Sequence, residues 1–176
     1  MRLGLLAVAL CLAAPPAVHG QSEDDFALRE LIEQLFPDAA SFSPKHGDPP
    51  HFKVYGAPSA EDAEPPLLGL AFWTTELEPL ERAYDGPIKI LVGIDTSGVL
   101  TGIVVVEHRE PYGYFSIDLP AFPRQFAGKS VRDRFRVGDD IDAITRATVT
   151  VTSASRAVRN GARRIARAHL EPPEER

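Results

Sequence analysis

The most regular pattern in the chain is IKILVGIDTSGVLTGIVVVEH, which spans residues 88–108. It holds two runs rich in β-branched residues, 88–95 and 99–108, separated by the short segment Thr96, Ser97 and Gly98. Glycine is favoured where a tight hairpin needs a positive φ, so this pattern predicts a β-hairpin. Both runs are almost continuously apolar, which indicates central strands of a sheet covered on at least one face.

The segments on either side of this hairpin predict an α+β domain. Alternating turn signals, apolar runs and one helical periodicity at each end give the expected order of elements. That order is helix 26–36, loop 41–50, strand 51–55, acidic loop 57–66, strand 67–75, the hairpin, irregular loop 109–123, polar segment 126–137, strand 144–151 and helix 153–169. We therefore expect a single domain with a twisted, mainly antiparallel sheet and an N-terminal and a C-terminal helix packed on it.

The first 20 residues have the pattern of a secretory signal peptide. Arg2 is followed by an apolar run at 3–14 and then by small residues before a polar segment. We expect cleavage after Gly20, one folded domain over residues 21–170 and a disordered tail at 171–176. The competing interpretation is a lipid anchor at Cys11, but the preceding Leu10 stands where a small residue is expected. The predicted location is the periplasm.

Composition excludes several classes of function. The net charge is −6, which argues against a nucleic-acid partner. The single cysteine lies in the predicted signal peptide, so the mature chain has no ligand set for iron–sulfur clusters or Cys-bound zinc. No His-Glu-x-x-His pattern is present, and no metal site is expected. No stretch after the signal peptide is apolar enough to cross a membrane.

The histidines and glycines of the hairpin region do not form a known catalytic or nucleotide-binding motif. Gly98 and Gly102 lie within the hairpin rather than between a strand and a helix, so neither a P-loop nor a Rossmann fingerprint fits. Also, no Gly-x-Ser-x-Gly elbow is present. His108 and Glu110 are either acid–base groups or hydrogen-bonded supports of the following loop.

Residues 142–150, DAITRATVT, are the best candidate for a functional motif. The hydroxyl of Thr148 is expected just upstream of a helix N-terminus, where free N–H groups and the helix dipole favour a phosphate. The alternative is a plain strand that leads into an ordinary amphipathic helix. Thr145, Thr150 and Thr152 are the other hydroxyl-bearing threonines in or beside this segment.

Arginines line one side of the predicted last helix, at 156, 159, 163 and 167. Such a stripe is either a solvated face or a docking surface for an acidic partner.

Four segments, 68–75, 84–95, 108–115 and 142–154, resemble in matching order the periplasmic flavin-binding domain of the NosR/NirI family. More distantly, the chain is similar to the RnfG- and NqrC-type FMN-binding subunits. The resemblance implies that residues 21–170 form an FMN-binding domain and that FMN is joined to Thr148 by a phosphoester bond that a flavin transferase makes. Asp142, Thr145 and Ala147 match the family motif, whereas Arg146 stands where the Rnf-type motif has glycine.

The same resemblance implies that the flavin ring contacts the loop of Glu110, Pro111, Tyr112 and Gly113, together with Trp73; the alternative for the aromatic residues is ordinary packing. The implied function is an exported electron-transfer flavoprotein, not an enzyme, that serves a membrane electron donor and/or a periplasmic reductase.

One alternative function is a non-redox accessory or maturation module that binds a reductase or its membrane partner. Another is an accessory domain that feeds electrons to a separate flavin reductase. NosR-like proteins continue into membrane helices and iron–sulfur modules, whereas this sequence ends at Arg176. We therefore expect the flavin domain to act without modules of that kind in the same chain.

Overall fold

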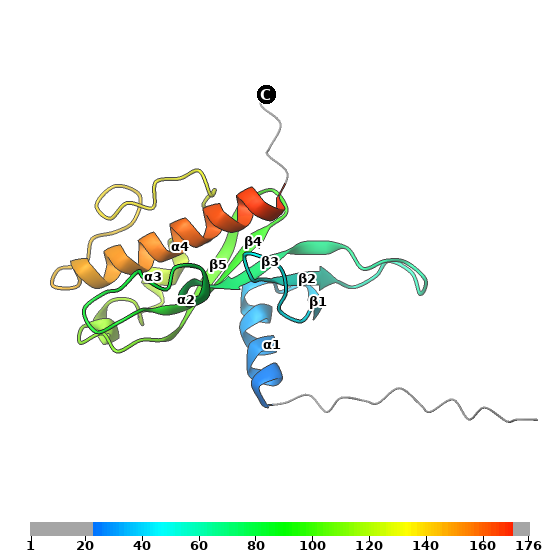
Figure 1. Ribbon diagram of the computed structural model, residues 1–176, viewed down its shortest axis with the longest axis horizontal. Coiled ribbons are helices and arrows are strands. Elements are labelled where there is room, and N and C mark those ends of the chain that lie inside the picture. Colours follow the sequence, from blue (N-terminus) through cyan, green and yellow to red (C-terminus); the bar gives the residue numbers. More distant parts are fainter. Residues whose placement is uncertain (1–22, 171–176) are drawn as a thin grey trace, which may run out of the picture.

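A five-stranded antiparallel sheet forms the centre of the computed structural model, which describes residues 23–170 (Figure 1). Its strands lie in chain order: β1 (Ala39–Phe42), β2 (Phe52–Gly56), β3 (Leu67–Trp73), β4 (Lys89–Asp95) and β5 (Leu100–Glu107). Helix α1 (Glu23–Leu35) precedes the sheet and helix α4 (Thr148–His169) follows it, which confirms the predicted α+β class. The expectations for residues 1–20 and 171–176 lie outside the described residues.

The predicted hairpin is present as β4 and β5. In its turn, the Asp95 carboxylate accepts hydrogen bonds from the N–H groups of Ser97 and Val99, at 2.8 and 2.9 Å. Gly98 has a φ of 84°, a conformation that glycine adopts at no steric cost. The turn is therefore formed by residues close together in the sequence, which is why it could be predicted.

Helix α4 packs on one face of the sheet through a close approach at Gly161. A Cβ atom at Gly161 would lie 2.5 Å from Cε2 of Phe72, so a larger residue would collide with this fully buried ring. Val151, Ala154 and Val158 belong to the same core cluster as Phe72. Small residues on α4 thus bring the helix close enough to cover the sheet.

Helix α1 covers the opposite face. Leu35 and Phe36 pack with Ala71 and Leu91, which are side chains of β3 and β4 that point away from α4. A Cβ atom at Gly93 would lie 2.9 Å from Cε2 of Phe36, so glycine is needed there as well. Each face of the sheet therefore has its own helix and its own core.

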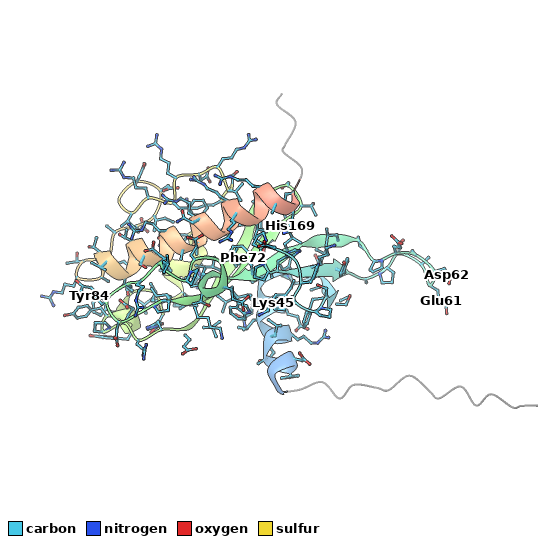
Figure 2. The ribbon with its side chains drawn as sticks, viewed as in Figure 1. Lys45, Glu61, Asp62, Phe72, Tyr84 and His169 are labelled. Atoms are coloured by element: carbon cyan, nitrogen blue, oxygen red, sulfur yellow. The ribbon has the colours of Figure 1, made fainter. Side chains whose placement is uncertain are left out.

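Several short elements differ from the predicted boundaries. Strand β1 overlaps the start of the segment predicted as loop, and the predicted strand 67–75 ends at Trp73, where helix α2 (Thr74–Leu77) begins. Helix η1 (Gly113–Phe115) lies within the loop predicted as irregular, and α3 (Ala121–Arg124) overlaps its end. The connection between β2 and β3 projects from the domain, and Figure 2 shows Glu61 and Asp62 near its tip.

The predicted strand at 144–151 is wrong. Residues 144–147 form a turn, and α4 begins at Thr148 rather than at 153. β-Branched residues lose only a few tenths of a kcal/mol each in a helix, so packing can override their preference. Ala147, Val151, Ala154 and Val158 are all buried at helical spacing, and their burial on the sheet outweighs that small loss.

No helix between residues 23 and 170 is long and apolar enough to span a bilayer.

Candidate functional site

The segment that precedes α4 is a tight turn with a left-handed residue. The N–H of Ala147 donates to the carbonyl of Ile144 at 3.0 Å, and Arg146, the third residue of this turn, has a φ of 72°. Turns of this kind favour glycine at the third position. A left-handed conformation at this position is compatible with the glycine that the Rnf-type motif has there, and in this chain Arg146 adopts it.

The N-terminus of α4 has no side-chain cap. Ala147 occupies the cap position, and alanine has no oxygen that could accept from the N–H groups of the first turn. Thr148 is the first residue of the helix and its side chain is exposed. A helix start with free donors and a partial positive charge is suited to bind an anion, and here an exposed hydroxyl lies beside it.

Two residues further on, Thr150 faces the interior. Its hydroxyl donates to Oε2 of Glu110 at 2.6 Å, and both side chains are buried. Glu110 also accepts from the backbone N–H of Tyr84 at 3.3 Å and of Asp85 at 3.0 Å. The structure therefore brings the predicted loop residue Glu110 to the predicted motif, through a hydrogen bond to Thr150 that the sequence analysis did not anticipate.

His108 organises the loop that holds Glu110. Its Nδ1 accepts from the N–H of Glu110 at 3.1 Å, so its proton resides on Nε2, which donates to Asp118 at 2.7 Å. A Cβ atom at Gly113 would overlap the His108 ring, so only glycine leaves room for it. These contacts favour the supporting role for His108 over the acid–base role.

The other predicted site residues fall into two groups. Pro111 and Tyr112 are exposed on the loop that contains Glu110, and Asp142 and Thr145 lie at the surface before α4. Trp73, in contrast, packs with the α1 cluster on the opposite face of the sheet, with the Lys89 ammonium 4.9 Å from its ring centre. The structure therefore does not bring Trp73 to the face that α4 covers.

An open pocket of about 460 Å³ lies beside the loop that begins at His108 and contains Glu110. Its lining includes residues from α2, from the start of β4 and from the end of β5: Thr75, Glu76, Pro87, Lys89, Glu107, His108 and Arg109. Small-molecule pockets are typically of this size. The lining carries both signs of charge. In contrast, the rings of Tyr112 and Tyr114 on the neighbouring loop both pack against the ring of Phe115.

The arginines of α4 mostly hold neighbouring loops. Arg163 donates to the carbonyls of Val131 and Asp133, at 2.9 and 2.8 Å. Arg164 donates to the carbonyl of Leu77 at 2.9 Å. Arg156 forms an ion pair with Glu81 at 2.8 Å. These contacts give Arg156 and Arg163, two of the four arginines of the predicted stripe, a structural role that the sequence pattern alone did not indicate.

Within residues 23–170, no group of three or more His, Cys, Asp or Glu side chains is arranged to hold a metal ion.

Comparison with known proteins assigns the region that contains this site. Residues 83–163 match the family of FMN-binding domains. The chain carries an FMN-binding domain. The matched segment contains both the Glu110 loop and the start of α4, whereas Trp73 lies before it.

The relatives of this FMN-binding domain belong to two kinds of protein. The chain is 39% identical over 87 residues to the G subunit of the ion-translocating oxidoreductase complex of Vibrio vulnificus, a match covering 44% of this chain and 41% of the relative. It is 28% identical over 157 residues to the regulatory protein NosR of Stutzerimonas stutzeri, covering 83% of this chain and 20% of the relative.

The NosR of Pseudomonas aeruginosa is 31% identical over 149 residues, covering 78% of this chain and 20% of the relative. The chain thus spans about two fifths of the length of the Vibrio relative and one fifth of each NosR protein.

Proposed function

We propose that this protein is an exported electron-transfer flavoprotein in which FMN is joined covalently to Thr148 through a phosphoester bond. The observation that carries the proposal is the uncapped start of α4, where an exposed threonine is the first helical residue within a matched FMN-binding domain. The helix N–H groups would donate hydrogen bonds to the phosphate oxygens there. The signal-peptide pattern predicted from the sequence of residues 1–20 supports a periplasmic location.

The residues around Thr148 fit a phosphoester. Ala147 leaves the first-turn donors available, and the positive φ of Arg146 turns the chain so that Thr148 follows directly as the first helical residue. The Arg146 guanidinium is exposed within two residues of the acceptor and adds positive charge there. Asp142 and Thr145 lie at the surface in the same segment, accessible to the flavin transferase that would modify it.

Attachment requires an activated phosphate, which the pyrophosphate of FAD can supply. The Thr148 oxygen would form a bond to the phosphorus of the FMN half, the pyrophosphate bond would break and AMP would leave. The hydroxyl proton would pass to a base of the transferase. The domain is therefore the acceptor substrate of this reaction and performs no catalysis itself.

The flavin supplies reversible electron transfer when it is bound, and the chain supplies its position. We place its ring against the loop of Pro111, Tyr112 and Gly113, which the Glu110 carboxylate ties to the first turn of α4. The redox role is supported by the name of the Vibrio relative, part of an oxidoreductase complex. A membrane electron donor and a periplasmic reductase are the proposed partners.

Coexpression with a flavin transferase, followed by intact-mass measurement and visible spectroscopy, tests the attachment. We expect one covalent FMN on the wild type and on Thr148→Ser, which keeps a hydroxyl, and none on Thr148→Ala. The control Thr145→Ala removes a hydroxyl from the preceding turn and should still be modified. An FMN adduct on folded Thr148→Ala would refute the site.

The second candidate function is a non-redox accessory module, which the name "regulatory protein" of the two NosR relatives favours. Purification from the periplasm of the native host separates the two functions. A yellow protein with covalent flavin that can be reduced and reoxidised supports electron transfer. A colourless protein of unmodified mass supports the non-redox role.

A further inference from the structure

Glu110 connects three segments that are far apart in the sequence. Its Oε1 accepts from the N–H of Asp85 at 3.0 Å, and its Oε2 accepts from the N–H of Tyr84 at 3.3 Å and from the hydroxyl of Thr150 at 2.6 Å. The residue is only 7% exposed. A carboxylate removed from water needs such donors, and three of them satisfy it well.

This connection sets the direction of the first turn of α4. Residues two positions apart on an α-helix point about 200° apart around its axis. Thr150 is fully buried against Glu110, so Thr148 must point outward, and its side chain is exposed. The inward hydrogen bond at Thr150 and the outward hydroxyl at Thr148 are therefore two consequences of one helix orientation.

Besides the burial of Ala147 and Val151, the first turn of α4 has little local support. Ala147 provides no side-chain cap, and Arg146 occupies a left-handed conformation that is unfavourable for a residue with a Cβ atom. The helix then begins with five β-branched residues, from Thr148 to Thr152, which have modest helix propensity. A carboxylate near a helix N-terminus is also electrostatically favourable. Glu110 thus supplies an external tie where the local sequence is weak.

We propose that Glu110 is a positioning residue for flavin attachment: by holding Thr150 inward, it presents the hydroxyl of Thr148 to the flavin transferase in a fixed orientation. This inference rests on the function proposed above and gives Glu110 a role different from contact with the flavin ring. Glu110 does not touch the reacting phosphorus, and it acts through Thr150 and the helix.

The test compares variants of Thr150 as acceptor substrates for a purified flavin transferase with FAD. Thr150→Val preserves the shape of the side chain and removes the donor to Glu110. Thr150→Ser restores the hydroxyl. Thr152→Val is the matched control, since among the described residues the hydroxyl that binds Glu110 is that of Thr150. The rate of adduct formation is followed by intact mass over a range of acceptor concentrations.

We expect Thr150→Val to lower kcat for attachment roughly tenfold, the effect of losing one hydrogen bond to a charged group. KM for the acceptor should stay the same, because residues 142–148 remain accessible for recognition. Thr150→Ser should recover most of the rate, and Thr152→Val should stay within about twofold of the wild type. In flavin-free protein, amide hydrogen exchange at Val151, whose N–H donates to the carbonyl of Ala147 at 2.9 Å, should be faster in Thr150→Val alone, as expected for a loosened first turn.

Three results would overturn the inference in distinguishable ways. If the wild type is modified and Thr150→Val, still folded by thermal unfolding, is modified at the same rate, Glu110 does not position the acceptor although the proposed function stands. If the wild type itself gains no FMN, the proposed function fails and the inference fails with it. A Thr150→Val defect that appears only as a raised KM also contradicts positioning.

Discussion

At its first residue, α4 has an exposed threonine after an alanine that cannot cap it, whereas at its last residue the His169 ring packs 4.1 Å from the ring of the buried His51. Figure 2 shows Tyr84 near the first end and His169 at the other. Between the two ends the helix rests on Phe72. The N-terminal end of α4, called the open end below, therefore has N–H groups available to a ligand. The C-terminal end, called the closed end, is covered by the packing of His169 on His51.

This contrast shows that the first turn of a helix can be left available for a ligand when the rest of the helix is held by packing. The middle of α4 is fixed by burial, so its first turn can remain without a cap while the helix stays formed. A free helix start costs about 1 kcal/mol relative to a capped one, which is small against the burial of the apolar face. Four predictions test the contrast between the fixed middle, the closed end and the open end of α4.

The largest effect should follow from loosening the middle of α4. Phe72→Ala should lower the free energy of unfolding by about 3–5 kcal/mol, because it leaves a cavity under Gly161. Chemical denaturation measures the loss. The control Tyr114→Ala removes a ring that is 70% exposed and should change stability by under about 0.5 kcal/mol. Equal losses in the two variants would mean that Phe72 does not support the helix.

The closed end should make stability depend on pH. Burial, and then the nearby charges of His169, His46 and Lys53, lower the pKa of His51 below its ordinary value of 6.5, although the hydrogen bond to Pro49 opposes this. The unfolded chain therefore binds the proton more readily. The contribution of His51 is complete above pH 6.5 and is lost as the pH falls through the folded-state pKa.

Denaturation at several pH values below about 7 measures this dependence, since that range brackets the ordinary titration of histidine. His51→Phe keeps a ring and removes the titration, so its stability should fall less steeply with acid. The control His46→Gln changes an exposed neighbour and should keep most of the wild-type slope. If the stability of His51→Phe depends on pH as steeply as that of the wild type, a group other than His51 causes the dependence.

The open end should respond to an added cap. Ala147→Ser provides an oxygen for the free N–H groups and should stabilise the flavin-free protein by about 0.5–1 kcal/mol. In the covalently flavinylated protein the gain should vanish, because the phosphate would already use these donors. The control Ala143→Ser lies in the exposed segment before the turn and should have little effect in either form. An equal gain in both forms would mean that the phosphate does not use the N–H groups of the first turn.

The smallest effect should come from the turn itself. Arg146→Gly should stabilise the flavin-free protein by about 0.5 kcal/mol, since relief of the left-handed strain slightly exceeds the entropy lost by glycine on folding. Thr145→Gly, at the neighbouring residue without a positive φ, should destabilise it. Thermal unfolding measures both changes, and a destabilised Arg146→Gly would mean that the arginine side chain makes a stabilising contact.

Much of the fold could be predicted because its signals are local. The hairpin turn depends on the hydrogen bonds of Asp95 to residues two and four positions on and on the positive φ of Gly98, which are local features, and α1 ends shortly before Pro37. The start of α4 could not be assigned in the same way. Thr148, Val149 and Thr150 have the local preference of a strand. The segment is helical because the helix buries its apolar side against a sheet whose residues are far away in the sequence.

The candidate site shows the same division. The motif at residues 142–148 and the loop at 110–113 are each visible in the sequence, and the family match includes both. The hydrogen bond that connects them joins residues 40 positions apart and has no local signal. Helical spacing of Ala147, Val151, Ala154 and Val158 was the available clue that Thr150 faces inward.

Sequence alone was enough for the α+β class, the central hairpin and the threonine motif, because periodicity, turn chemistry and motif spacing are properties of short segments. The packed structure was needed to show that Thr148 begins a helix, that Trp73 belongs to the other face and that Glu110 holds Thr150. The physical reason is that side-chain burial and a hydrogen bond between distant segments exist only after the chain has packed.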